Sequence, residues 1–157
     1  MTRSLSSTST RTFLVLPALA LAESALTRRR PHLAFLPLLP WGYLQYRLCG
    51  SYRTHHGGGG PGMGRPPERI VTTGPYAITR NPMYVGHLVF LTGLTLATRS
   101  RVVALATVAL LPWFDARART DERVLLEIFG PEYARYHAAV PRWLPSPFMA
   151  LTRRRPP

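Results

Sequence analysis

The chain lacks lysine altogether and has only one cysteine among its 157 residues. All 20 basic residues are arginine, against only 7 acidic residues, and the formal net charge is +13. The single Cys49 excludes an intramolecular disulfide and a metal site built from several cysteines. The five histidines show no ligand spacing apart from the adjacent His55 and His56, which sit beside a glycine run typical of a flexible loop. We therefore expect no metal site.

Long apolar runs are also missing, since a helix that crosses a bilayer needs about 20 apolar residues. Instead, shorter apolar blocks alternate with arginine-bearing breaks, and the blocks cover residues 13–26, 32–49, 83–98 and 102–114. Apolar residues surround the whole circumference of each block, which favours short membrane helices over the amphipathic helices of a soluble bundle. The predicted fold is all-α. It is a polytopic membrane protein with about four transmembrane helices, a helical hairpin in its C-terminal half and a cytoplasmic amphipathic C-terminal helical segment.

The first block has two interpretations that stay open. Residues 13–26 follow Arg3 and Arg11 and can be a transmembrane helix or a cleaved secretory signal. If all four blocks span, one side of the membrane carries 15 arginines and the other 5. The positive-inside rule then predicts that both termini and the active site are cytoplasmic. We expect membrane headgroups, and no nucleic acid, as the anionic partner, because no basic-aromatic recognition motif is present.

The stretch GPYAITRNPMYVGH, residues 74–87, predicts a turn at Gly74-Pro75, an extended run over 76–79 and a helix that starts at Pro82. The free N–H groups of that helix start, with Arg80 beside them, can bind a carboxylate or a phosphate. A capped helix with an arginine reaching for the membrane surface is the simpler explanation. Gly86 and Gly93 share one helix face, which allows close helix packing or, less commonly, a close ligand.

The segment after the fourth block changes character and predicts an amphipathic helix. Val124, Leu125, Ile128 and Phe129 fall on one face of this segment. Pro131 starts a second short helix with Tyr133 and Tyr136, and Arg142-Trp143 is typical of a membrane interface anchor. The adjacent acids Asp121 and Glu122 are ordinarily part of a solvated face, although a cationic ligand would give them another role.

In this order the motifs resemble the isoprenylcysteine carboxyl methyltransferase and phospholipid methyltransferase family of integral membrane enzymes, over roughly residues 70–145. They are Gly74-Pro75-Tyr76, Arg80-Asn81-Pro82-Met83-Tyr84 with Gly86, Asp121-Glu122 with Leu125, Phe129-Gly130 with Tyr133 and Tyr136, and Arg142 with Pro145. The isoprenylcysteine branch usually has His at the position of Asn81 and often Glu at that of Asp121. The sequence Asn-Pro-Met-Tyr is more similar to the phosphatidylethanolamine N-methyltransferase branch.

The resemblance implies methyl transfer from S-adenosylmethionine to a lipidic or prenylated acceptor, either a carboxylate or an amine. The expected catalytic residues are Arg80, Glu122, Arg119 and Arg142. The expected cofactor-binding residues are Gly74, Pro75, Tyr76, Arg80, Asn81, Pro82, Tyr84, Gly86, His87, Asp121 and Glu122. In this scheme the arginine and the helix start meet the cofactor carboxylate, and Glu122 accepts from its ammonium or ribose.

Two other classes stay open: an NADPH-dependent membrane enzyme similar to the steroid and sterol reductases, and a non-catalytic membrane protein with the same fold. We expect a single domain over 1–157. It comprises a helix pair at 12–50, a basic glycine-rich cytoplasmic loop at 51–73 and a cofactor-binding catalytic core at 74–145. The sequence sets neither the methyl acceptor nor the oligomeric state.

Overall fold

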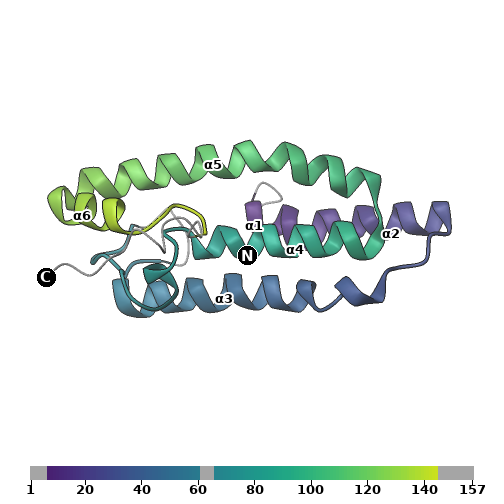
Figure 1. The fold of residues 1–157 in the computed structure, drawn as a ribbon, viewed down its shortest axis with the longest axis horizontal. Helices are drawn as coiled ribbons and strands as arrows, with labels where there is room; N and C mark the ends of the chain where they lie inside the picture. The colour runs from purple at the N-terminus through teal and green to yellow at the C-terminus, as the bar shows by residue number, and fades with distance from the viewer. Residues whose placement is uncertain (1–6, 61–65, 145–157) are drawn as a thin grey trace, which may run out of the picture. The chain divides into compact units, whose positions relative to one another are not determined.

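The computed structural model describes residues 7–60 and 66–144, and every regular element in them is helical (Figure 1). Within these residues there is no strand, which confirms the predicted all-α class. Pro145 and Arg3, both used above, lie outside the described residues. The elements in chain order are α1 (Thr8–Thr10), η1 (Arg11–Val15), α2 (Leu16–Thr27), η2 (Leu33–Phe35), α3 (Leu38–Gly57), η3 (Gly74–Ala77), α4 (Pro82–Thr98), α5 (Arg101–Phe129) and α6 (Pro131–Ala139).

The expectation of about four transmembrane helices is not met by these helices. Across the described parts of the chain, none combines the length and the hydropathy that crossing a bilayer requires. The apolar helix α4 has 17 residues, and α3, with 20 residues, includes polar and charged ones over its second half.

The chain divides into two compact units that share helices α3 and α5. Unit one comprises Met1–Leu48 and Met83–Arg117, and unit two comprises Cys49–Pro82 and Ala118–Pro157. Each unit is built from two separate stretches of chain.

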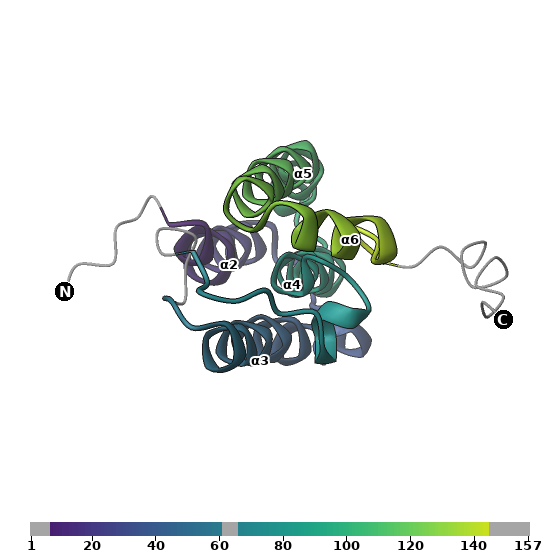
Figure 2. The ribbon, with the colours of Figure 1, turned by 90° about the vertical axis from the view of Figure 1, so that its left-hand side faces the viewer.

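Unit one is a bundle in which successive helices run in alternating directions (Figures 1 and 2). The turns α1 and η1 continue directly into α2, so the first helix runs unbroken from Thr8 to Thr27, with a π-helical turn at Arg11–Val15. Glycine brings α3 and α4 into backbone contact. A Cβ on Gly86 would lie 2.8 Å from the carbonyl oxygen of Gly42, and one on Gly42 would lie 2.5 Å from the backbone nitrogen of Phe90. The close packing expected for Gly86 is therefore present.

Aromatic rings fill the space between the helices of unit one. Phe13 stacks on His87, with ring centroids 4.7 Å apart, and meets Phe90 edge-on at 4.8 Å and Tyr46 at 5.1 Å. His87 is 2% exposed, and its Nδ1 has no hydrogen-bond partner among the described residues. Phe114, fully buried on α5, lies 5.7 Å from the same ring.

Two helix boundaries differ from the predicted blocks. Helix α3 runs on to Gly57 instead of ending near Cys49, because no proline lies between them and the single Gly50 is tolerated within the helix. Beyond it, Gly58 and Gly59 adopt φ of 71° and 71°, a conformation that glycine adopts readily. Helix α5 continues through Pro112 and joins the fourth apolar block to the amphipathic segment in a single helix of 29 residues.

The hydrophobic core of unit two gathers around α6. Tyr133, Tyr136 and Val140 are buried there, and Ile70, Leu125 and Phe129 pack against them. The predicted short helix from Pro131 is thus confirmed. The predicted apolar face of α5 is partly wrong, because Val124 and Ile128 are 38% and 47% exposed. The buried face is shifted, since it includes Asp121 and Glu122, which are 6% and 5% exposed.

Candidate functional site

The segment that leads into α4 is a tight turn, so the prediction of an extended run over 76–79 was wrong. Gly74 has φ of 57°, and Pro75 then sets the backbone for the 3-10 turn η3. The backbone N–H of Ile78 donates to the carbonyl of Pro75 at 3.3 Å, and that of Tyr76 to Thr73 at 3.1 Å. The predicted turn at Gly74-Pro75 and the start of α4 at Pro82 are both confirmed.

Tyrosine hydroxyls fix this turn inside unit two. The hydroxyl of Tyr136 on α6 donates to the carbonyl of Tyr76 at 2.7 Å, and the hydroxyl of Tyr76 donates to the carbonyl of Cys49 at 3.3 Å. Burial raises the pKa of both hydroxyls and raises the pKa of Tyr133 to about 12. All three rings therefore stay neutral in the physiological pH range and can act as hydrogen-bond donors.

Residues 79–81 are hydrogen-bonded to the segment after α6. The backbone N–H of Arg80 donates to the carbonyl of Pro141 at 2.9 Å, and the Thr79 hydroxyl donates to the carbonyl of Arg142 at 2.8 Å. The same hydroxyl accepts from the backbone N–H of Asn81 at 3.2 Å. These bonds hold Arg80, Asn81 and Arg142 within reach of one another.

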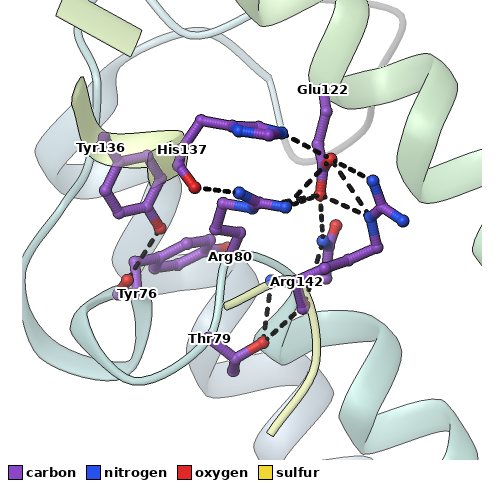
Figure 3. A network of polar contacts seen from close by, with 8 residues as sticks. Tyr76, Thr79, Arg80, Glu122, Tyr136, His137 and Arg142 are labelled. Carbon is purple, nitrogen blue, oxygen red and sulfur yellow. Dashed lines mark hydrogen bonds and ion pairs between the residues drawn. The ribbon is translucent and has the colours of Figure 1, made fainter. Parts of the chain in front are cut away.

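Glu122 lies at the centre of these residues (Figure 3). Arg80 donates from Nε to Oε1 and from Nη2 to Oε2 of Glu122, both at 3.2 Å. Arg142 donates from Nη2 to Oε2 at 2.9 Å and from Nε to Oε1 at 3.1 Å. The Asn81 amide donates to Oε1 at 3.1 Å. We call Arg80, Asn81, Glu122 and Arg142 the arginine-glutamate cluster.

The cluster is largely removed from solvent. The side chains of Arg80 and Glu122 are each 6% exposed, and that of Arg142 is 23% exposed. Burial by itself would raise the pKa of Glu122. The hydrogen bond from Arg142, the positive charges of Arg80 and Arg142, and the hydrogen bond from Asn81 outweigh burial and lower that pKa. Glu122 is therefore ionised throughout the physiological range.

His137 forms the rim of the cluster. Its Nε2 lies 3.4 Å from Oε2 of Glu122, its side chain is 46% exposed, and its carbonyl accepts a hydrogen bond from Nη1 of Arg80. The imidazole is thus more exposed than the side chains of Arg80 and Arg142, which also contact Glu122 (Figure 3).

The structure brings together the predicted site residues Arg80, Asn81, Glu122 and Arg142. Unit two also contains Gly74, Pro75, Tyr76, Pro82, the buried Asp121, and Arg119, which is exposed on α5. Tyr84, Gly86 and His87 belong to unit one. The sequence interpretation assigned Arg80 and Glu122 to separate ends of a cofactor, whereas here they form an ion pair with each other.

Thr79 and the carbonyls of Pro141 and Arg142 were not anticipated as parts of the site. A threonine directly before Arg-Asn-Pro is a sequence signal that could have pointed to Thr79, because such hydroxyls commonly bond nearby backbone N–H groups. The carbonyls carry no sequence signal, since every residue has one.

Comparison with known proteins supports the same region. The family model described as phospholipid methyltransferase matches residues 59–132. This range includes Arg80, Asn81 and Glu122 of the arginine-glutamate cluster. Among curated proteins, the cobalt-zinc-cadmium resistance protein CzcN of Cupriavidus metallidurans is 37% identical over 83 residues, which cover 52% of this chain and 38% of the relative. No solved structure gives a significant match.

Two of the relatives are named as methyltransferases. Protein-S-isoprenylcysteine O-methyltransferase of Schizosaccharomyces pombe is 34% identical over 77 residues, covering 48% of this chain and 33% of the relative. Protein-S-isoprenylcysteine O-methyltransferase B of Arabidopsis thaliana is 32% identical over 79 residues, covering 50% of this chain and 40% of the relative. The chain thus matches less than half of the length of each of these relatives. The predicted family resemblance is confirmed.

Proposed function

We propose that this chain, a member of the isoprenylcysteine carboxyl and phospholipid methyltransferase family, transfers a methyl group from S-adenosylmethionine to a lipidic or prenylated acceptor. The observation that carries the proposal is the arginine-glutamate cluster. Its members come from three separate segments: the residues directly before α4, the second half of α5, and the chain after α6. These segments contain the motifs on which the family resemblance rests.

The charge balance of the cluster suits the amino-acid end of S-adenosylmethionine. One carboxylate, Glu122, faces two guanidinium groups, so the cluster retains a positive charge that a further carboxylate would neutralise. Glu122 also offers a full negative charge to an ammonium group. We assign Arg80, Asn81 and Arg142 to the carboxylate of the cofactor and Glu122 to its ammonium. The proposed site is completed by further residues of unit two, namely Gly74, Pro75, Tyr76 and Asp121.

When bound, S-adenosylmethionine supplies a methyl group on a positively charged sulfonium. The transfer is a displacement at carbon, for which the protein mainly aligns the reactants and excludes water. The buried cluster is suited to alignment because its side chains are held by several hydrogen bonds each. A carboxylate acceptor needs a guanidinium to orient it, and Arg119 remains our candidate. An amine acceptor needs a base, and His137 at the exposed rim is a candidate for that role.

A lipidic acceptor implies that the enzyme works at a membrane. In support, unit one exposes many large apolar side chains, among them Leu21 at 68%, Trp41 at 64%, Leu48 at 65%, Leu105 at 73% and Val108 at 65%. Contact with lipid removes exposed apolar side chains of this size from water, which is favourable. We propose that unit one contacts lipid, with the catalytic residues of unit two on the cytoplasmic side.

The test is a set of ligand titrations of the full chain in detergent. Thermal unfolding is the readout of binding. A ligand that binds only the folded state raises the apparent stability. We expect S-adenosylmethionine and S-adenosylhomocysteine to raise the unfolding temperature and NADPH to leave it unchanged. Stabilisation by NADPH alone would assign the chain to a reductase, and no stabilisation by any of the three would contradict an enzymatic role that uses these cofactors.

The acceptor is tested separately, with S-adenosylmethionine carrying a labelled methyl group. A farnesylated cysteine derivative offers a carboxylate, and phosphatidylethanolamine offers an amine. The names of two relatives favour the carboxylate, so we expect label in the farnesylcysteine ester. Label in the phospholipid alone would assign the chain to the amine-methylating branch.

A further inference from the structure

At one end of unit one, two chain turns are held together by hydrogen bonds to backbone carbonyls. The segment after α2 and the turn between α4 and α5 meet there. The backbone N–H of His32 donates to the carbonyl of Ala97 at 2.7 Å, and Nη1 of Arg29 donates to the carbonyl of Arg99 at 2.7 Å. These bonds fix the positions of arginines that are about 70 residues apart in sequence.

The side chain of Glu23, on α2, caps the start of α5 at the same end. Its carboxylate accepts from the backbone N–H of Arg101 at 3.1 Å and of Val102 at 3.3 Å, and from the hydroxyl of Ser100. The free N–H groups of the helix start are therefore bonded to a side chain of the protein itself. Glu23 lies 3.9 Å from Arg29, and this is the only ion pair that any of the surrounding arginines makes within the described residues.

Four arginines line a cavity of about 350 Å³ that is open to solvent at this end: Arg29, Arg30, Arg99 and Arg101. No acidic side chain is among the residues that line it. Positive charges gathered in one cavity repel one another, and the repulsion weakens only in proportion to distance and to the local dielectric constant. A bound anion would remove this repulsion.

Two arginines at this end follow the ends of helices in a left-handed backbone conformation. Arg99 follows directly after α4 and has φ of 52°. Arg28, at the end of α2, has φ of 50°. Glycine adopts this left-handed conformation with the least strain, and other residues are uncommon there. Arg99 also lines the cavity, so a guanidinium is present at a position whose backbone conformation glycine would adopt with less strain.

We propose that this cavity is a binding site for a phosphate group, provided either by a phospholipid headgroup or by a soluble phosphate compound. Guanidinium groups bind phosphate oxygens through paired, charge-assisted hydrogen bonds, and several of them can surround one phosphate. Apolar side chains flank the arginines in sequence, with Leu26 87%, Leu33 68% and Leu105 73% exposed. The site belongs to unit one, contains none of the residues assigned to methyl transfer, and is independent of the proposed reaction.

The test uses the full chain in a zwitterionic detergent at low ionic strength, with thermal unfolding as the readout. Inorganic pyrophosphate tests the soluble source. Phosphatidic acid in mixed micelles, compared with phosphatidylcholine, tests the lipid source. The variant is the double substitution Arg30→Gln/Arg101→Gln. Arg135→Gln, which removes one exposed positive charge from α6, serves as the control.

We expect pyrophosphate or phosphatidic acid to stabilise the wild type. The double variant should bind at least tenfold more weakly, while the control binds as the wild type does. Stabilisation by pyrophosphate identifies a soluble ligand, and stabilisation by phosphatidic acid alone identifies a headgroup; both results support the site. Equal affinity in the double variant, or no response of the wild type to either probe, would overturn it. If the double variant does not fold, Arg30→Gln alone is measured against the same outcomes.

Binding of S-adenosylhomocysteine by the double variant separates this inference from the proposed function. We expect that affinity to equal the wild-type value, because the arginine-glutamate cluster is untouched. A variant that loses phosphate binding and keeps cofactor binding assigns the loss to the cavity of unit one.

Discussion

The two units of this chain hold their helices together by different means. In unit one, rings pack against rings around His87, and glycine lets α3 and α4 touch backbone to backbone. In unit two, a buried carboxylate is held by two arginines and an amide, and tyrosine hydroxyls bond backbone carbonyls. Packing of the first kind is stable without being chemically specific. The second kind fixes charged groups in place, which a binding site requires.

This difference predicts that substitutions destabilise the two units for different reasons. Ring packing fails when the volume of a packed side chain changes. A buried ion pair fails when one partner is removed, because the other charge is then left without a counter-charge. The following substitutions separate these two kinds of stabilisation, from the largest expected effect to the smallest.

Glu122→Gln should have the largest effect. It keeps the shape of the side chain but leaves Arg80 and Arg142 without their shared carboxylate. Breaking a buried ion pair typically costs about 3–5 kcal/mol of unfolding free energy. Denaturant unfolding in detergent measures it, with Glu127→Gln, exposed on the same helix, as the control. A loss no greater than that of the control would mean that the cluster does not hold unit two together.

Gly86→Ala in unit one should have the next largest effect. The added methyl group would lie 2.8 Å from both the carbonyl oxygen of Gly42 and the backbone nitrogen of Tyr46. Overpacking of this kind costs about 1–3 kcal/mol, and the backbone atoms it meets cannot rotate away. Thr92→Ala, at an exposed position of α4, is the control. Unchanged stability would show that α3 and α4 can separate without loss.

Tyr136→Phe should cost about 1–2 kcal/mol of unfolding free energy. It removes the donor to the carbonyl of Tyr76 and leaves that buried acceptor without its partner. Tyr43→Phe is the control, because that ring is 43% exposed. If the two substitutions have equal effects, the hydroxyl of Tyr136 is not needed to hold the turn at Gly74-Ala77.

Mild acidification should have the smallest effect. The pKa of Glu122 is lower in the folded chain than in the unfolded chain, so the unfolded chain takes up its proton first as the pH falls. The stability that Glu122 contributes is therefore full above the ordinary glutamate pKa of about 4.3 and is lost below it, through the folded pKa. The difference in stability between the wild type and Glu122→Gln should shrink over that range and stay constant from pH 8 to pH 5. A difference that already shrinks above pH 6 would mean that the carboxylate is not ionised in the folded state.

Local chemistry was predictable from the sequence where a residue acts on its own neighbours. Proline at positions 82 and 131 correctly marked the starts of α4 and α6, because proline suits the first turn of a helix. Gly86 correctly predicted close helix packing. The extended interpretation of 76–79 failed because a glycine with positive φ followed by proline starts a tight turn, and the bonds that close it are not visible in the residue pattern.

Pairing between distant residues was predictable only in part. Arg80, Glu122 and Arg142 were each chosen as site residues, but their bonds to one another depend on how 79–81 is tied to 141–142. Backbone carbonyls accept those hydrogen bonds, and because every residue has a carbonyl, the residue pattern does not predict which of them are used. The length of α5 was missed because the change from apolar to charged residues after the block 102–114 suggested a boundary that the continuous helix does not have.

The most direct test of the account is a calorimetric titration of the detergent-purified chain with S-adenosylhomocysteine, with Asn81→Ala and Glu127→Gln measured alongside. Asn81 donates one hydrogen bond to Glu122 and can be removed without stripping the cluster of a charge. We predict saturable binding at one site, weakened by about fivefold to tenfold in Asn81→Ala, as the loss of one such bond implies, and unchanged in Glu127→Gln. An absence of binding, or an affinity that is the same in all three proteins, would contradict the assignment of the arginine-glutamate cluster as the cofactor site.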